Sequence, residues 1–185
     1  MAIVRPGNKS VLLVVDVQVD VMRNGWEAAR VVANVATVVE RARARGVPVL
    51  WVQHEDEKMP YDSPGWQWVP ELVPAAGEVR LFKKYSSSFE ETPLERELDR
   101  LGASHIVLAG AQSNWCIRAT AYGALDRGYD LTLVADAHTT DPIEREDGSA
   151  IEARGIVDDL NLAMTWLAYP GRRTRSAKAA ELDFG

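Results

Sequence analysis

The pattern of apolar and polar positions alternates between short continuous apolar runs and longer segments with helical spacing. The run at 11–15 is typical of a strand that is buried on both faces. Segment 27–45 follows, and its apolar residues recur at intervals of three, four and seven, which predicts a helix that covers a sheet. The same reading predicts strands at 47–53, 79–82, 106–109 and 131–135, a weak one within 174–182, and helices at 92–101, 116–127 and 149–167. Strands that alternate with helices predict a three-layer α/β/α fold with a mainly parallel central sheet.

The segment 54–78 interrupts this alternation. It contains four prolines, which exclude a long helix or a central strand there. Loops of this length without secondary structure of their own usually have a function. Trp66 and Trp68 lie in this loop, and they either form the wall of a pocket or cover the core.

Length, charge and cysteine content narrow the class of protein. The 185 residues suit a single domain, 1–185, at the usual prior of roughly 150 residues per domain. The formal net charge of −6 argues against a nucleic-acid partner, since such binding depends on clustered Lys and Arg. The single cysteine cannot form an internal disulfide, and the run at 11–15 is too short to span a membrane. We therefore expect a cytoplasmic protein with no membrane partner.

Three chemically active side chains come at the ends of predicted strands. Asp16 follows the first strand, Lys83 follows a short later strand, and Cys116 lies in the strand-to-helix segment 110–116. In parallel sheets of this kind the ligand crevice lies beyond the carboxyl ends of the strands, so these side chains are expected to meet there.

Each of these residues also has a structural interpretation. A thiol at a helix N-terminus is expected to have a lowered pKa and to be nucleophilic, but a free cysteine often only packs in the core. Asp16 is costly to bury without a purpose, although it could simply cap the following loop. Together, a thiol, a carboxylate and an ammonium suit nucleophilic attack on a carbonyl or amidine carbon.

Three sequence blocks carry a family resemblance. The first is Val-Val-Asp-Val-Gln, which ends at Gln18; the second is Lys-Lys-Tyr-Ser-Ser-Ser-Phe, which ends at Phe89 and is followed by Glu-Glu-Thr-Pro-Leu. The third runs from Gly110 through Cys116 and continues to Val-Ala-Asp-Ala at 134–137. In this order the blocks resemble the isochorismatase-like cysteine hydrolases, which include nicotinamidases, N-carbamoylsarcosine amidohydrolases and ureidoacrylate hydrolases. The resemblance implies a Rossmann-type strand order.

The resemblance also implies catalytic roles. Cys116 would be the nucleophile, Asp16 the general base and Lys83 the cation that holds both. The register to Phe89 and the phase of the strand favour Lys83 over the adjacent Lys84.

A cis peptide bond precedes the nucleophile in this family, and here it would join Ala111 to Gln112. It would direct the N–H of Gln112, together with that of Cys116, at the developing oxyanion. The resemblance further implies a homo-oligomer, either a dimer or a tetramer.

The substrate side of the site is less defined. The candidate substrate-binding residues are Gln18, Trp115 and Trp66. The metal motif D-x-H of nicotinamidases reads Val-Gln-His here and ends at His54, so its Asp is missing and we expect neither a metal nor a cofactor. His54 either lines the pocket or is a polar residue at a strand exit.

These features predict a cysteine-dependent hydrolase that cleaves a C–N bond of a small molecule, in an amide, carbamoyl or ureido group, through a covalent acyl-enzyme. One alternative is a vinyl-ether hydrolase of the isochorismatase type. Another is a catalytically silent binding protein of the same fold.

Overall fold

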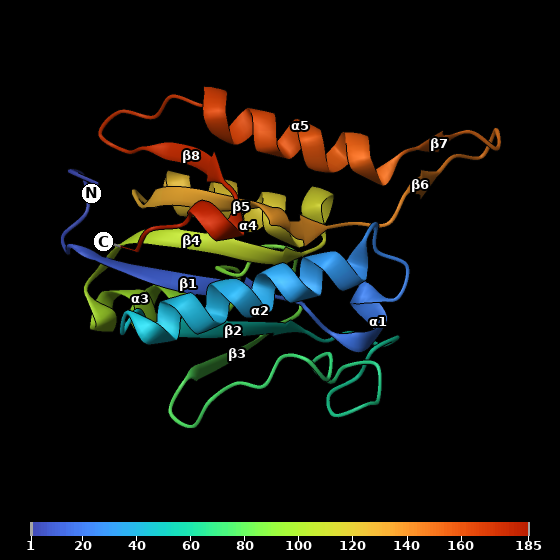
Figure 1. Cartoon of the computed structure of the whole chain (residues 1–185), viewed down its shortest axis with the longest axis horizontal. Helices are drawn as coiled ribbons and strands as arrows, with labels where there is room; N and C mark the ends of the chain where they lie inside the picture. Colours follow the sequence, from blue (N-terminus) through green and yellow to red (C-terminus); the bar gives the residue numbers. More distant parts are fainter. Residues whose placement is uncertain (1, 185) are drawn as a thin grey trace.

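The computed structural model describes residues 2–184, and its elements alternate as the pattern predicts. Figure 1 labels them along the chain. The strands are β1 (Lys9–Val15), β2 (Val49–His54), β3 (Val79–Lys83), β4 (Ala103–Ala111), β5 (Asp130–Thr139), β6 (Ile143–Glu144), β7 (Ala150–Ile151) and β8 (Thr174–Ala177). The α-helices are α1 (Val19–Met22), α2 (Ala28–Ala44), α3 (Leu94–Leu101), α4 (Arg118–Asp126) and α5 (Ala153–Trp166).

The central sheet has the order β3-β2-β1-β4-β5-β8, and every neighbouring pair in it is parallel. This confirms the predicted α/β fold with a parallel central sheet and a Rossmann-type order. The chain leaves β1 toward β2 on one side and later returns to β4 on the other. The crevice at this switch point is where such folds place their ligands.

Helices cover both faces of the sheet because the strand residues are apolar on both sides. In β1, Val11, Leu13 and Val15 belong to one core cluster and Leu12 and Val14 to the other, and all five are fully buried. The first cluster packs against α3, α4 and α5, and the second against α2. Figure 1 shows α2 lying across the near face of the sheet, with α3 and α4 behind it.

Several elements differ from the expected bounds. The residues Ser113–Ile117 form a π-helical turn, so α4 begins two residues after Cys116 rather than at it. Before α5 the chain forms the β6–β7 hairpin, which projects from the body of the molecule in Figure 1. The short helix α1 was not predicted either. Such two-residue strands and single-turn helices leave too short a periodic pattern to be recognised.

Close packing of two strand ends requires a glycine at Gly110. Its φ is +129°, and a Cβ built there would lie 1.9 Å from the carbonyl oxygen of Val15. Asp16, the residue that follows β1, has a φ of +53°, a region that non-glycine residues rarely occupy. The two strand ends are thereby brought into contact, and the first candidate residue lies at this contact.

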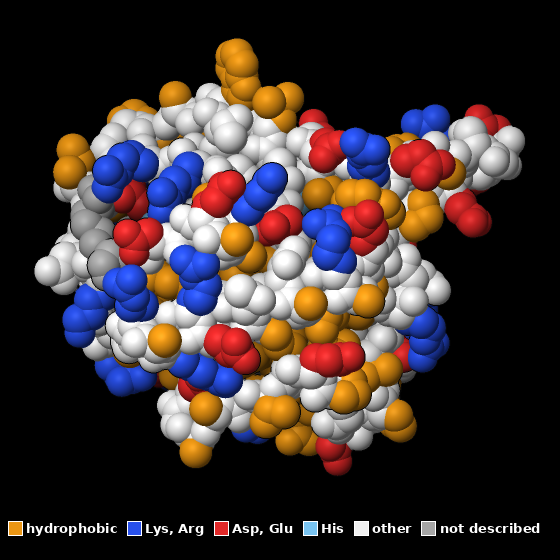
Figure 2. Space-filling view, viewed as in Figure 1, with side chains coloured by type: hydrophobic (Ala, Val, Ile, Leu, Met, Phe, Trp, Pro, Cys, Tyr) orange, Lys and Arg blue, Asp and Glu red, His pale blue; other side chains and the backbone are white. Residues whose placement is uncertain are grey.

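The surface shows no concentration of one charge on the face covered by α2. Figure 2 shows Lys and Arg interspersed there with Asp and Glu. Within residues 2–184, no helix is both long enough and apolar enough to cross a membrane.

Candidate active site

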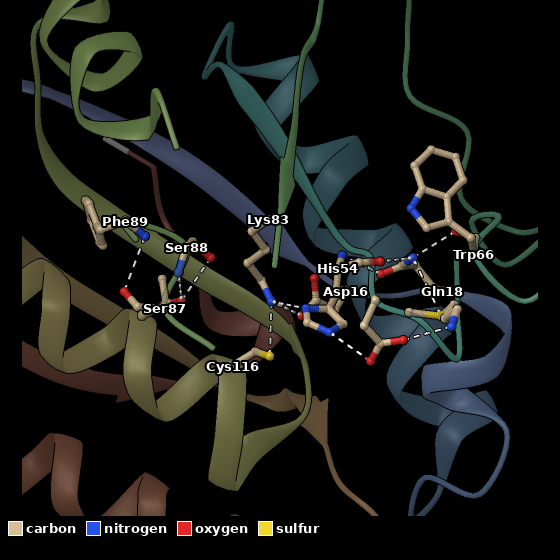
Figure 3. Close-up of polar contacts among 12 residues, drawn as sticks. Asp16, Gln18, His54, Trp66, Lys83, Ser87, Ser88, Phe89 and Cys116 are labelled. Carbon is tan, nitrogen blue, oxygen red and sulfur yellow. Dashed lines mark hydrogen bonds and ion pairs between the residues drawn. The ribbon is translucent and has the colours of Figure 1, made fainter. Parts of the chain in front are cut away.

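The structure brings the three sequence-predicted residues together at the carboxyl end of the sheet. Lys83 Nζ lies 2.7 Å from Asp16 Oδ2 and 3.1 Å from Cys116 Sγ. Figure 3 shows the Lys83 side chain extending from β3 with its ammonium between the other two groups. The side chains of Lys83 and Asp16 are almost fully buried, with 0% and 1% exposed, whereas Cys116 is half-buried. A carboxylate, an ammonium and a free thiol thus share one point of contact.

Lys83, and not the adjacent Lys84, belongs to this group. The Lys84 side chain is 72% exposed, and its nearest acidic partner, Glu55, is 3.9 Å away. Burial lowers the pKa of the Lys83 ammonium, but the charge of Asp16 and the Cys116 thiol outweigh this effect and raise the pKa above its ordinary value. Lys83 is therefore charged at neutral pH, and Asp16 is its buried counter-ion.

The expectation of a lowered pKa for Cys116 is wrong. Burial is the largest cause that raises the pKa of the thiol, the carboxylate of Asp16 adds to it, and Lys83 opposes both; the net result is a pKa of about 12. Cys116 lies within the π-helical turn rather than at the start of α4. At neutral pH the resting thiol is therefore protonated, and a base must remove its proton.

The second sequence block fastens the segment after Lys83 to α4. The N–H of Ser88 donates to Thr120 Oγ1 at 2.9 Å, and the Thr120 hydroxyl donates to Ser88 Oγ at 2.9 Å. Phe89 stacks on Tyr129 with ring centroids 6.1 Å apart. Since α4 continues directly from the turn that holds Cys116, these contacts fix the lysine relative to the thiol.

The turn that carries the nucleophile begins with an unusual backbone. The peptide bond between Ala111 and Gln112 is cis, and Gln112 is followed by the π-helical turn. The carbonyl oxygen of Gln112 accepts hydrogen bonds from the N–H groups of Trp115 and Ile117, both at 3.1 Å. The turn therefore closes on itself just beyond the end of β4.

A cavity of about 360 Å³ opens over the thiol. Its lining consists of Asp16, Asp20, Val21, His54, Asp56, Lys58, Met59, Ser86, Gln112, Trp115 and Cys116. Five of these residues were not recognised as site residues from the sequence, namely Asp20, Val21, Asp56, Lys58 and Met59, and Ser86 was recognised only as part of the second block. Apart from Ser86, they follow β1 and β2 closely, so the rule that ligands bind beyond strand ends could have indicated them.

His54 lines the cavity and contacts the lysine. Its Nδ1 lies 3.5 Å from Lys83 Nζ, and its Nε2 lies 3.3 Å from Asp56 Oδ2. Asp56 is itself held by the backbone, since its Oδ1 accepts hydrogen bonds from the N–H groups of Lys58 and Met59, each at 2.8 Å. The hydrogen bond from Met59 is the main reason that the pKa of Asp56 is lowered. The cavity wall therefore carries a firmly ionised carboxylate.

Two of the three expected substrate-binding residues do not line this cavity, which corrects that expectation. Gln18 is fully buried, and its Nε2 donates to the carbonyl oxygens of His54 and Trp66 at 3.0 and 2.9 Å. Trp66 is buried against Tyr61 and Phe82. Both residues fasten the long loop to the strand ends. Trp115, the third candidate, lines the cavity and is 55% exposed.

A metal centre has no visible donor set here. Among the described residues 2–184, no group of three or more His, Cys, Asp or Glu side chains is arranged to hold a metal ion. Asp16 and His54 contact Lys83, Asp56 contacts His54, and Asp20 forms an ion pair with Arg23.

Comparison with known proteins identifies the family. The isochorismatase domain matches residues 10–157 of the chain. The chain belongs to the isochorismatase family of hydrolases. Among its relatives, a streptothricin hydrolase of Streptomyces noursei is 35% identical over 161 residues, which cover 83% of this chain and 61% of that protein. The chain thus spans less than two thirds of the length of that relative.

Solved structures of the isochorismatase family agree with this fold. An isochorismatase from Pseudomonas putida has a TM-score of 0.84 and 28% identity, with 97% of this chain and 94% of that chain covered. An N-carbamoylsarcosine amidase from Thermoplasma acidophilum has a TM-score of 0.75 and 26% identity, with 95% and 99% covered. The chain thus shares its overall fold with these proteins.

Proposed function

We propose that this isochorismatase-family chain is a cysteine-dependent amidohydrolase that cleaves a C–N bond of a small amide, carbamoyl or ureido substrate through a covalent acyl-enzyme. The observation that carries the proposal is the contact of the buried Lys83 ammonium with both Asp16, at 2.7 Å, and Cys116, at 3.1 Å. This arrangement provides a nucleophile, a base and a fixed cation beside one cavity.

In the first half of the reaction, Cys116 Sγ attacks the substrate carbonyl carbon. Because the pKa of the thiol is raised to about 12, its proton must move to Asp16 as the S–C bond forms. The Asp16 carboxylate is suited to receive it, since it is a hydrogen-bond partner of the thiol as well as the ion-pair partner of Lys83. Lys83 keeps the total charge of the group low at every stage. When the C–N bond breaks, Asp16 passes the proton to the leaving amine, and a thioester remains on Cys116.

In the second half, water enters the space left by the amine. Asp16 takes one proton from the water as its oxygen attacks the thioester carbon. The C–S bond then breaks, the thiolate recovers the proton, and the acid product leaves. The sum of both halves is the hydrolysis of one C–N bond by one water molecule.

The N–H groups of Gln112 and Cys116 are the proposed donors to the oxyanion. Both residues line the cavity, and Gln112 follows the cis peptide bond. Removing one such donor typically costs about 10²–10³ in kcat. Backbone donors also cost little reorganisation, since the turn is already closed.

The volume and charge of the cavity suggest the size and type of substrate. About 360 Å³ lies at the small end of the usual range for ligand sites. Asp56 lies on the wall with a single Lys58, Asp20 lies there as the ion-pair partner of Arg23, and the exposed ring of Trp115 adds an aromatic surface. This lining favours a substrate with a cationic group next to the scissile amide.

The names of similar proteins support C–N hydrolysis. A ureidoacrylate amidohydrolase of Methylobacterium radiotolerans is 28% identical over 186 residues.

The proposed chemistry also needs a reduced thiol, so we propose a cytoplasmic location. From the family resemblance we propose a dimer or a tetramer, which sedimentation analysis would test.

The experiment is a panel of primary amides, ureides and carbamoyl amines, incubated with wild-type protein and with the Cys116→Ser and Cys116→Ala variants, with ammonia or amine release as the readout. We expect release by the wild type only. If no member of the panel is hydrolysed, the amidohydrolase proposal fails. If the Cys116→Ala variant instead cleaves isochorismate as fast as the wild type, the vinyl-ether alternative replaces it.

A further inference from the structure

A buried histidine lies directly behind the nucleophile turn and has no part in the chemistry described above. His138 is on β5, is 1% exposed and does not line the cavity. Its Nδ1 lies 2.7 Å from Ser113 Oγ, and its Nε2 lies 3.2 Å from Asn161 Oδ1. It therefore connects the first residue of the turn to helix α5.

The hydrogen bonds around His138 have a definite direction. Asn161 Nδ2 donates to the carbonyl oxygen of Ala135 at 2.9 Å, and the Ser176 hydroxyl donates to Asn161 Oδ1 at 2.7 Å. Asn161 Oδ1 is therefore an acceptor, so Nε2 of His138 must carry the hydrogen. Burial lowers the pKa of His138 to about 4, so the ring is neutral and Nδ1 has a free lone pair. The Ser113 hydroxyl consequently donates to Nδ1.

The hydrogen bond from Ser113 to His138 can fix the position of the nucleophile turn. It follows Gln112 directly and precedes Cys116 by three residues, so both proposed oxyanion donors belong to the same short turn. The next residue, Asn114, is held from the residue that follows this strand, because the Thr140 hydroxyl donates to its Oδ1. The end of β5 and the residue after it thus hold the first two residues of the turn by their side chains.

We propose that His138 is a positioning residue. By accepting a hydrogen bond from the Ser113 hydroxyl, it holds the turn at 112–116 so that the backbone N–H groups of this turn and the Cys116 thiol face the substrate carbonyl. This proposal rests on the proposed amidohydrolase function. It assigns to His138 an effect on kcat and none on substrate affinity, since the ring does not reach the cavity.

A second histidine, the half-buried His105, serves as a control. The pKa of His105 is also lowered to about 4 by burial, and its ring also bonds at both nitrogens, to Ser10 Oγ at 2.9 Å and to Thr132 Oγ1 at 2.8 Å. It lies near the start of β4, at the opposite end of the sheet from the thiol. Its replacement should cost comparable stability without disturbing the turn.

The test compares His138→Gln, His138→Asn and His105→Gln. An asparagine oxygen can replace Nδ1 as the acceptor for Ser113, whereas a glutamine reaches toward Asn161 and leaves Ser113 without an acceptor. We expect His138→Gln to lower kcat about 10²-fold with KM within threefold of wild type, because misplacement of a catalytic turn by about 1 Å costs that much. His138→Asn should recover at least tenfold of this loss, and His105→Gln should keep kcat within twofold.

Ser113→Ala provides a second variant that leaves the histidine in place. It should reproduce the loss in kcat, and the double variant with His138→Gln should lose little more, since both remove the same hydrogen bond. If His138→Gln does not fold, Ser113→Ala decides the question alone. A kcat within twofold of wild type in a folded His138→Gln or Ser113→Ala variant, or a loss confined to KM, would overturn the proposal.

A readout without turnover separates this proposal from the proposed function. Amide hydrogen exchange across 112–117 should be faster in His138→Gln and Ser113→Ala than in His105→Gln. If the wild type hydrolyses no amide, the proposed function fails while the exchange comparison still tests the turn. Unchanged exchange in both variants would overturn the positioning role even if the amidase activity is real.

Discussion

The buried ion pair allows a quantitative prediction. In Lys83→Met the apolar stem is largely kept and the ammonium is lost, so Asp16, with 1% of its side chain exposed, has no counter-ion within the group. Removing one member of a buried pair typically costs about 3–5 kcal/mol, because an uncompensated charge stays in the interior. That is a large share of the total stability of about 5–15 kcal/mol of a folded protein. We therefore expect the free energy of unfolding to fall by about 3–5 kcal/mol.

Urea denaturation measures this loss, and the neighbouring lysine is the control. Lys84→Met removes a side chain that is 72% exposed and 3.9 Å from its acidic partner, so its cost should stay within about 0.5 kcal/mol. The double variant Asp16→Asn with Lys83→Met removes both charges and should recover more than half of the single loss. A cost below about 1 kcal/mol for Lys83→Met, or one equal to that of Lys84→Met, would refute the reasoning.

Three further predictions concern other features of the molecule. Burial lowers the pKa of His105 and His138 from 6.5 to about 4, so the unfolded chain binds more protons than the folded chain in this pH range. The free energy of unfolding should therefore fall by about 3 kcal/mol per histidine from pH 6.5 to 4. A fall in His138→Gln equal to that of the wild type would speak against this. Gly110→Ala places a Cβ 1.9 Å from the carbonyl oxygen of Val15 and should destabilise the protein by more than about 2 kcal/mol in thermal unfolding. Gly155→Ala, with open space around it, should stabilise the protein by about 0.5 kcal/mol. Similar stability changes in the two variants would argue against the close contact at Gly110. Asp56→Asn should lower kcat/KM for 5-aminopentanamide about fivefold to tenfold and leave that for hexanamide unchanged, and equal effects on both amides would exclude a cation subsite.

The sequence was sufficient to predict the fold because its apolar periodicity is strong. The apolar run at 11–15 and the spacing in 27–45 correspond to β1 and α2 within a few residues at each end. The meeting of Asp16, Lys83 and the nucleophile turn at one sheet edge also followed from the rule on parallel strands.

Other properties of the site depend on contacts that no local pattern contains. The raised pKa of Cys116 results from burial and from Asp16, which is 100 positions earlier in the chain, and a reading based on the helix terminus alone predicted the opposite direction. Gln18 belongs to a conspicuous motif and Trp66 to a conspicuous loop, yet neither faces the cavity. Both are buried, and the Gln18 amide donates a hydrogen bond to the carbonyl oxygen of Trp66. The proposed role of His138 depends on its contacts with Ser113 and Asn161, which lie on two other elements.

The central claim is that Cys116 forms a covalent bond to the acyl group of an amide, and mass spectrometry tests it most directly. A reaction with a slow primary amide is quenched in acid during turnover, and the intact protein and its peptides are weighed. We predict an increase equal to the acyl group, located on the peptide that contains Cys116 and absent from the Cys116→Ala variant, which should release no ammonia. Ammonia release by Cys116→Ala at the wild-type rate, with no acyl adduct on the wild-type protein, would contradict the account.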